Sequence, residues 1–168
     1  MPQNAAPQPG DTYLQFDGLS SYAEIPSIAA YSVANTGELT VSAWMRPDVL
    51  EFPHAEGTNY VHWMGKGNSY GATGDQEWTC RMYSFTTTDS PPRPNRTSSY
   101  FQGGLSRVRI WGRALGAAEI AGLFAVDTVP RDKLVAEFLL NADTGAAAID
   151  TALGNNGTIN GASWATLA

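Results

Sequence analysis

An all-β protein is predicted from three properties of the sequence. Short stretches in which apolar and polar residues alternate recur along the chain, as in strands whose two faces meet different surroundings. Seventeen glycines and ten prolines separate these stretches, and only 15% of the residues are charged. A chain of 168 residues can bury one complete hydrophobic core, so we expect a single domain with many turns.

The N-terminal part predicts a flexible arm followed by a hairpin. Residues 1–12 are rich in proline, glutamine and alanine and offer little to bury. Residues 12–18 then alternate between apolar and polar side chains and end at a glycine. Residues 21–26 follow after a short link, and we expect them to form the partner strand.

Three further strands are expected before the middle of the chain. The clearest covers residues 39–47, where one face carries Leu39, Val41, Ala43 and Met45 and the other carries Thr40, Ser42, Trp44 and Arg46. Residues 60–67 and 77–85 give two more strand patterns. Residues 86–99 are polar and rich in proline, which predicts an extended loop.

The next segment predicts a strand that leads into a short helix. In residues 105–111, Val108 and Ile110 point inward if the strand is offset at Gly103–Gly104, and the opposite face then carries Arg107, Arg109 and Trp111. Residues 113–124 place four apolar side chains on one side of a helix: Leu115, Ile120, Leu123 and Phe124. Gly116 takes the N-cap position, and Glu119 supplies the glutamate half of a capping box. So short a helix must pack on the sheet to be stable.

The C-terminal part predicts further strands. Residues 126–133 form a linker, and residues 134–140 have the pattern of a strand. A turn-rich connection follows, and residues 157–165 give a final strand pattern with Asn160–Gly161 inside it.

Three of these segments together resemble the laminin-G-like, concanavalin-A-like lectin domains. They are "YLQFDGLSSYAEIP" (13–26), "LTVSAWMRP" (39–47) and "FQGGLSRVRIWGRALGAAEIAGLF" (101–124). The resemblance implies a two-sheet antiparallel jelly-roll sandwich, in which one short helix after the VRIW strand covers one end of the core.

The tail, "LVAEFLLNADTGAAAIDTALGNNGTINGASW" (134–164), is similar to the segment that usually precedes the FDG strands in this family. Residues 134–168 therefore either complete the same sandwich as a circular permutation, beside residues 13–26, or begin a second repeat. We favour the permutation, with residues 13–168 as one domain, because so short a segment cannot bury a core alone.

The resemblance also shows a difference in the middle of the chain. Family members carry several more strands between the segments that correspond to residues 77–85 and 105–111. A shortened sandwich would leave strand edges bare, which soluble proteins avoid. We therefore expect a neighbouring chain or a further segment to cover them, in a homo-oligomer or a larger assembly.

Charge and hydropathy exclude several classes of partner. A net charge of −6 without a basic stripe argues against nucleic acid. No apolar run approaches the ~20 residues of a membrane helix, so we expect no membrane insertion. The N-terminus lacks the features of a signal peptide, and we expect a location on a virion surface or outside the cell by another route.

The sequence lacks the side-chain sets expected of an enzyme. No strand carries paired carboxylates on one face; Asp75 and Glu77 come nearest, in what the pattern predicts to be a turn. Glu51 and Glu56 flank His54 in a predicted loop, and His54 and His62 have no third partner at metal-ligand spacing. Cys80 is the only cysteine and fits a small core residue. We therefore predict a protein without catalytic residues.

Two sets of residues are candidates for binding. Aromatic and arginine side chains on the middle strands could stack on and hydrogen-bond to sugars, although such tryptophans also serve as core residues: Trp44, Trp63, Trp78, Tyr83, Arg46 and Arg81. Oxygen-bearing residues in the C-terminal connection could hold a structural Ca²⁺, although they are also common turn formers: Asp143, Asp150, Asn155 and Asn156. The resemblance implies a Ca²⁺ at this edge in some relatives.

Three functions follow from these expectations. The first is a non-catalytic surface-recognition module that binds carbohydrate or a protein surface in recognition or adhesion. The second is a structural decoration or minor capsid-type subunit of a virion or another particle, favoured by the arm and the bare edges. The third is a glycan hydrolase or lyase, which the missing carboxylate pair disfavours.

Overall fold

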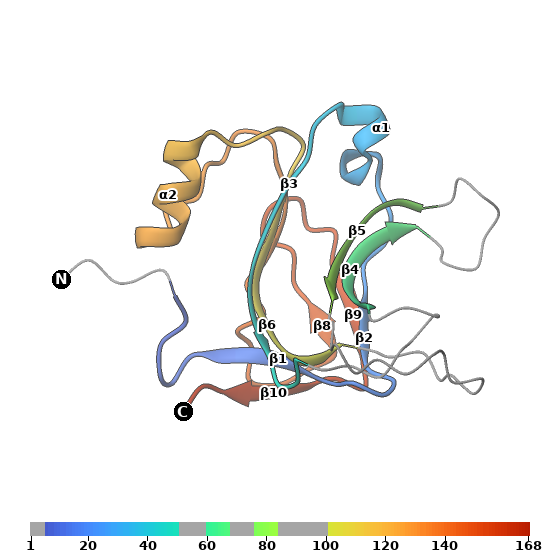
Figure 1. The fold of residues 1–168 in the computed structure, drawn as a ribbon, viewed down its shortest axis with the longest axis vertical. Coiled ribbons are helices and arrows are strands. Elements are labelled where there is room, and N and C mark those ends of the chain that lie inside the picture. Colours follow the sequence, from blue (N-terminus) through green and yellow to red (C-terminus); the bar gives the residue numbers. More distant parts are fainter. Residues whose placement is uncertain (1–5, 51–59, 68–75, 84–100) are drawn as a thin grey trace.

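The computed structural model describes residues 6–50, 60–67, 76–83 and 101–168. In chain order the elements are β1 (Thr12–Asp17), β2 (Tyr22–Glu24), the 3-10 turn η1 (Ala29–Tyr31), α1 (Val33–Thr36), β3 (Thr40–Pro47), β4 (Tyr60–Gly67), β5 (Gln76–Tyr83), β6 (Gln102–Trp111), α2 (Ala117–Val126), β7 (Leu134–Phe138), β8 (Ala147–Ala148), β9 (Gly157–Asn160) and β10 (Ser163–Thr166) (Figure 1). All strand pairs among the described residues are antiparallel, and the predicted all-β class with a short helix after the VRIW strand is confirmed. The predicted loop over 86–99 lies outside the described residues.

The largest sheet is built around the ten-residue strand β6. Its strands run in the order β10-β1-β6-β3, and β7 also pairs with β6. Because β3 pairs along one whole edge of β6, β1 and β7 share the other edge, β1 opposite the first half and β7 opposite the second. We call this five-stranded sheet the large sheet.

A second layer faces one side of the large sheet. It consists of a three-stranded sheet in the order β2-β9-β8 and of the β4–β5 hairpin. Buried side chains from both layers form one core, among them Phe16, Leu105, Val108, Ile110 and Phe138 of the large sheet and Val61, Ala148 and Ile159 of the second layer. We call the side of the large sheet that faces this core the inner face and the opposite side the outer face.

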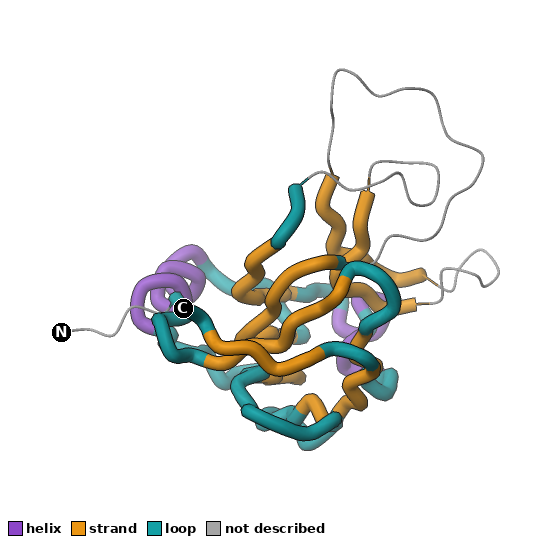
Figure 2. Tube along the Cα trace, turned by 90° about the horizontal axis from the view of Figure 1, so that it is seen from below, coloured by secondary structure: helices purple, strands orange, loops and turns teal. Residues whose placement is uncertain are grey.

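The C-terminal strands are interleaved with the N-terminal ones. Strand β10 pairs with β1, β9 with β2, and β7 with β6. The backbone N–H of Gly10 donates to the carbonyl of Leu167 (2.8 Å), and the C-terminus lies on the side of the molecule that carries α2 (Figures 1 and 2). Residues 134–168 therefore share both sheets with residues 12–24.

The final strand pattern of the sequence is divided between two strands. Residues 157–160 form β9 of the three-stranded sheet, and residues 163–166 form β10 of the large sheet. Between them Gly161 has φ 71°, a left-handed conformation that glycine adopts without strain. The chain therefore crosses from one layer to the other at this turn.

The alternation predicted for β3 is confirmed. Leu39, Val41, Ala43 and Met45 all pack against the main core. Because side chains alternate along a strand, Trp44 and Arg46 project from the outer face.

The alternation of inward and outward side chains along β6 is interrupted, as predicted, but at a different residue. Leu105, Val108 and Ile110 all belong to the main core, although Leu105 and Val108 are three positions apart. Ser42 pairs with Arg109 and Trp44 with Ser106, so β6 has one residue more than β3 between these pairs. This bulge lies at Arg107, whose φ is 50°. The predicted offset at Gly103–Gly104 was therefore wrong, because the backbone changes face at the bulge.

Helix α2 packs less closely than its apolar pattern predicts. Leu123 is buried against Trp111 and Leu134. Ile120 and Phe124, in contrast, are 52% and 69% exposed, so only part of the predicted apolar side packs on the sheet. The predicted glutamate half of the capping box is present, since the N–H of Gly116 donates to Oε2 of Glu119 (2.9 Å).

Candidate functional site

The outer face of the large sheet carries an aromatic and cationic pair of side chains. The guanidinium carbon of Arg46, on β3, lies 4.8 Å from the centre of the Tyr13 ring, on β1. Nη2 of Arg46 also donates a hydrogen bond to the Tyr13 hydroxyl (2.6 Å). A cation over an aromatic face is attracted by the ring quadrupole, so this contact holds both side chains in place.

Polar groups extend from this pair along the surface. Nη2 of Arg46 lies 3.6 Å from Oδ1 of Asp48, and Nε2 of Gln15 donates to Oδ2 of Asp48 (2.7 Å). The Arg46 side chain is 52% exposed, and a guanidinium has five N–H donors. The row Tyr13–Arg46–Asp48–Gln15 therefore offers both donors and acceptors to a ligand.

Trp44 lies next to this row and forms a wall between two hollows. Its ring stacks on Phe124 of α2, with centroids 5.9 Å apart and planes 25° apart. One hollow, of about 240 Å³, is lined by Trp44, Tyr13, Arg46 and Ser106. The other, of about 410 Å³, lies between β3 and α2 and is lined by Trp44, Ser42, Ile120 and Phe124. We call the two hollows, together with the row Tyr13–Arg46–Asp48–Gln15 beside them, the outer groove.

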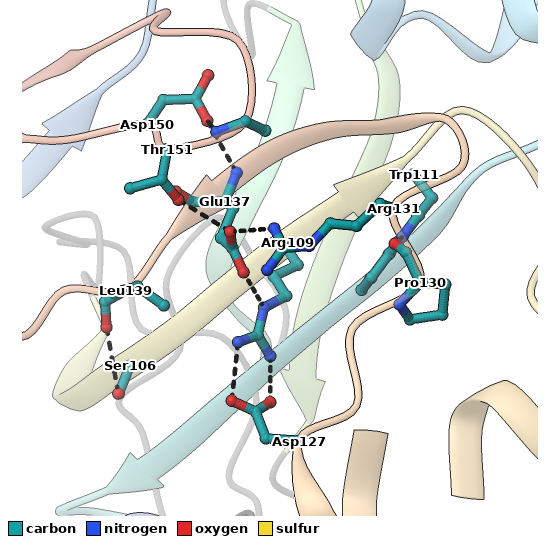
Figure 3. A network of polar contacts seen from close by, with 11 residues as sticks. Ser106, Arg109, Trp111, Asp127, Pro130, Arg131, Glu137, Leu139, Asp150 and Thr151 are labelled. Atoms are coloured by element: carbon teal, nitrogen blue, oxygen red, sulfur yellow. Dashed lines mark hydrogen bonds and ion pairs between the residues drawn. The ribbon is translucent and has the colours of Figure 1, made fainter. Parts of the chain in front are cut away.

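A buried polar network fixes the C-terminal end of α2 (Figure 3). The Arg109 side chain is 3% exposed, and its Nη1 and Nη2 donate to the carboxylate of Asp127 (2.6 and 3.0 Å). Asp127 is the C-cap of α2, in a left-handed conformation. Nε of Arg109 donates to Oε1 of Glu137 on β7 (3.0 Å). One guanidinium thus ties the helix end to two strands of the large sheet.

Glu137 remains ionised in this network. Burial by itself would raise its pKa, but hydrogen bonds from Arg131, Thr151 and Arg109 outweigh this effect and hold the pKa below its usual value. Nη1 of Arg131 donates to Oε2 of Glu137 (2.6 Å), and the Thr151 hydroxyl donates to the same oxygen (2.9 Å). The network is therefore a set of paired charges, which avoids the cost of an isolated buried charge.

A second ion pair fixes the N-terminal end of α2. Arg113 donates two hydrogen bonds to the Glu119 carboxylate (2.8 and 2.6 Å). These bonds and the one from the Gly116 N–H lower the pKa of Glu119 to about 2. With both ends held, Phe124 is kept beside Trp44.

The structure divides the predicted sugar-binding residues between the two layers. Trp44 and Arg46 lie in the outer groove, whereas Trp63 and Trp78 pack against the core from the β4–β5 hairpin. Nε1 of Trp78 donates to the carbonyl of Tyr31 (2.9 Å). Arg81 is exposed on β5 opposite His62, and the Tyr83 side chain lies outside the described residues.

The residues predicted to hold Ca²⁺ do not fit a cation. Asp150 is 3% exposed, and both of its oxygens accept backbone N–H groups, Oδ1 from Glu137 and Ala152 (2.9 Å each) and Oδ2 from Leu153 and Asn155 (3.2 and 3.0 Å). A carboxylate that satisfies four donors shapes a turn without a metal.

The remaining predicted ligands point to other partners. Oδ1 of Asn156 accepts from the Asp150 N–H (2.9 Å), Nδ2 of Asn155 donates to the carbonyl of Pro26 (2.8 Å), and Oδ1 of Asp143 accepts from the Thr12 hydroxyl (2.9 Å). Within the described part of the chain, no three His, Cys, Asp or Glu side chains are placed to hold a metal ion.

The residues weighed for catalysis have structural partners or are not described. Glu77 pairs with Lys66, and its pKa is lowered by that hydrogen bond and by one from Ser32. Burial raises the pKa of the Cys80 thiol, which disfavours the reactive thiolate. Asp75, His54 and the two glutamates that flank His54 lie outside the described residues.

Several residues of the outer groove were absent from the sequence prediction. Tyr13 and Gln15 alternate with the buried Leu14 and Phe16, so their position on a solvent face could have been identified from the pattern. Phe124 could not, because its helical spacing indicates a core residue.

Comparison with known proteins shows a similarity of fold and none of sequence family. No family model and no curated protein matches the sequence. The fold is similar to the 1.50 Å crystal structure of a "putative carbohydrate binding protein" from Bacteroides ovatus ATCC 8483, with a TM-score of 0.51 and 14% identity. The match covers 96% of this chain and 61% of that one, so the chain spans about three fifths of its neighbour. In the described parts of the chain, no helix is long and apolar enough to cross a bilayer.

Proposed function

We propose that this chain is a non-catalytic carbohydrate-binding module with a laminin-G-like, concanavalin-A-like fold, and that the glycan binds in the outer groove. The similar fold of a protein described as carbohydrate-binding supports the class. The observation that carries the site is the position of Trp44, whose ring is shared by two hollows and lies beside the Tyr13–Arg46 pair.

The chemistry of the outer groove suits a sugar. A pyranose has an apolar face that can be buried against an indole ring, and hydroxyls at its edge that need hydrogen-bond partners. Trp44 supplies the ring, and the row from Tyr13 to Gln15 supplies the partners. Ligand sites commonly combine an apolar wall with a few placed polar groups in this way.

The charges around the outer groove favour a neutral glycan. Each arginine in its lining already faces a carboxylate, Arg46 that of Asp48, Arg107 that of Asp11, and Arg109 those of Asp127 and Glu137. An acidic sugar would have to compete with these carboxylates for the guanidinium groups. A neutral sugar can instead hydrogen-bond to the ion pairs as they stand.

Binding to a glycan array, followed by titration of Trp44→Ala with the best glycan, tests the proposal. We expect binding to at least one neutral glycan and an affinity loss of about tenfold or more, or about 1.4 kcal/mol, because the variant removes the stacking surface. Trp63→Phe is the matched control, because it changes a tryptophan of the second layer and should leave the affinity unchanged. Absence of binding to any glycan, or an equal loss in both variants, would contradict the proposal.

A second candidate is a structural subunit of a virion or another particle, at its surface. It is favoured by the edge of β3, which pairs only with β6 among the described strands. An unpaired strand edge can accept a strand from a neighbouring chain. The mass of the purified chain in solution tests this candidate: a stable oligomer supports it, and a monomer at high concentration contradicts it.

A further inference from the structure

A cavity of about 250 Å³ lies between the two layers, on the side of the large sheet opposite to the outer groove. Its lining comes from both layers, with Phe16, Leu105 and Val108 from the large sheet and Trp63, Trp78 and Ala148 from the second layer. Tyr22 and His62, which also line it, are exposed, so the cavity reaches the surface beside them.

Aromatic and aliphatic side chains form most of the cavity wall. The rings of Phe16 and Phe101 lie 6.0 Å apart and are tilted by 58°. Trp63 and Trp78 close the wall from the β4–β5 hairpin. Aromatic rings prefer such offset or tilted contacts with one another, and a ligand ring in the cavity could pack against this wall with the same geometry.

Four polar side chains of the cavity wall have partners within the protein. Lys66 is ion-paired with Glu77, and Nδ1 of His62 lies 2.9 Å from the Thr79 hydroxyl. The Ser21 hydroxyl donates to Oδ1 of Asp17 (2.8 Å), and the Tyr31 hydroxyl accepts from Asn155 (3.1 Å). A charged or hydroxyl-rich ligand would therefore have to break these bonds, whereas an uncharged apolar one would not.

The apolar wall of this cavity is a poor site for water. Its lining loses dispersion contacts, and water fills a site well only where it finds two to four polar partners. An engineered, enclosed cavity of about 150 Å³ with an apolar lining binds benzene or xenon. We infer that the cavity between the layers binds a small uncharged aromatic molecule, independently of any glycan in the outer groove.

Thermal unfolding of the full chain with p-xylene tests this inference. At about ten times the dissociation constant, p-xylene should raise Tm by roughly 4 °C. The anion p-toluate should have a much smaller effect at the same concentration. Ala148→Leu places a larger side chain in the cavity and should abolish the shift. Ala147→Leu is the matched control, because Ala147 is the exposed neighbour of Ala148 on β8 and should leave the shift unchanged.

A second measurement decides the case even if Ala148→Leu does not fold. In the unaltered chain, p-xylene should give intermolecular NOEs to the methyl groups of Ala148 and Val108. The inference is overturned if p-xylene gives neither a Tm shift nor these NOEs, if p-toluate binds more tightly than p-xylene, or if a folded Ala148→Leu variant retains the whole shift.

Discussion

The inner and outer faces of the large sheet satisfy opposite requirements. The inner face consists mainly of apolar side chains, among them Leu105, Val108 and Ile110 of β6, which belong to the main core. The outer face presents ion pairs and aromatic rings, from the buried Arg109 at one end to the exposed Arg46 at the other. A ligand with many hydroxyls is therefore expected on the outer face, and an apolar one on the inner face.

The outer face itself has two parts that differ in burial. Around Arg109 the charges are covered by α2 and its following loop, so they hold the structure together. Around Arg46 similar charges are exposed and can contact a ligand. The predicted effects of substitution therefore fall on stability in the first part and on binding in the second.

The largest effect is expected from Arg109→Met. This change leaves the carboxylates of the buried Glu137 and of Asp127 without their shared guanidinium. The free energy of unfolding should fall by about 3 kcal/mol. This is the lower end of the range for breaking a buried ion pair, because Arg131 still pairs with Glu137. Denaturant unfolding measures the loss. Arg113→Met, which removes the more exposed ion pair with Glu119, should cost much less. Equal losses of unfolding free energy in the two variants would contradict the prediction that the more buried ion pair contributes more to stability.

A smaller effect, on binding, is expected from Gly104→Ala. The added Cβ would lie 2.6 and 2.7 Å from two atoms of the Tyr13 ring, so the ring must move away from Arg46. Losing the cation–π contact should lower the affinity for the glycan about two- to fivefold. Isothermal titration measures the change.

The control for this variant is Gly116→Ala, whose Cβ would meet only Glu119 Oε2, at 3.7 Å. It should bind as the unaltered chain does. If Gly104→Ala binds with full affinity although NMR shows a displaced Tyr13 ring, the Tyr13–Arg46 pair is not part of the glycan site.

The smallest effect is expected from Glu119→Gln, and it depends on pH. The pKa of Glu119 is lowered from 4.5 to about 2, so its ionised form stabilises the fold above pH 4.5 and loses this contribution as the pH falls towards 2. The variant lacks the contribution at every pH. Urea unfolding between pH 7 and pH 2 should therefore show the two stabilities converging below pH 4.5. A constant difference across this range would contradict the ion pair with Arg113.

The sequence predicted the parts of the fold that depend on local pattern. The strict alternation of residues 39–47 identified the two faces of β3, because each inward position is apolar. Glycine and glutamate at fixed spacing identified the start of α2. Both signals act within a few residues of one another.

Features that depend on distant residues were not predictable in this way. The bulge at Arg107 depends on how β3 and β6 pair, and the exposure of Phe124 depends on the network that holds α2 through Arg109. Trp44 lies on the large sheet, whereas Trp63 and Trp78 lie in the second layer. This difference could be predicted only by knowing which strands form which layer. A tryptophan on an alternating strand indicates one face or the other, but not what covers that face.

The most direct test of the glycan site is an NMR titration that follows the indole N–H signals of the tryptophans. With the best neutral glycan from the array, the signal of Trp44 and the backbone amides of Arg46 and Ser106 should shift most, while the signals of Trp63 and Trp78 stay in place. Largest shifts at Trp63 and Trp78 would place the glycan in the second layer and contradict the assignment of the outer groove.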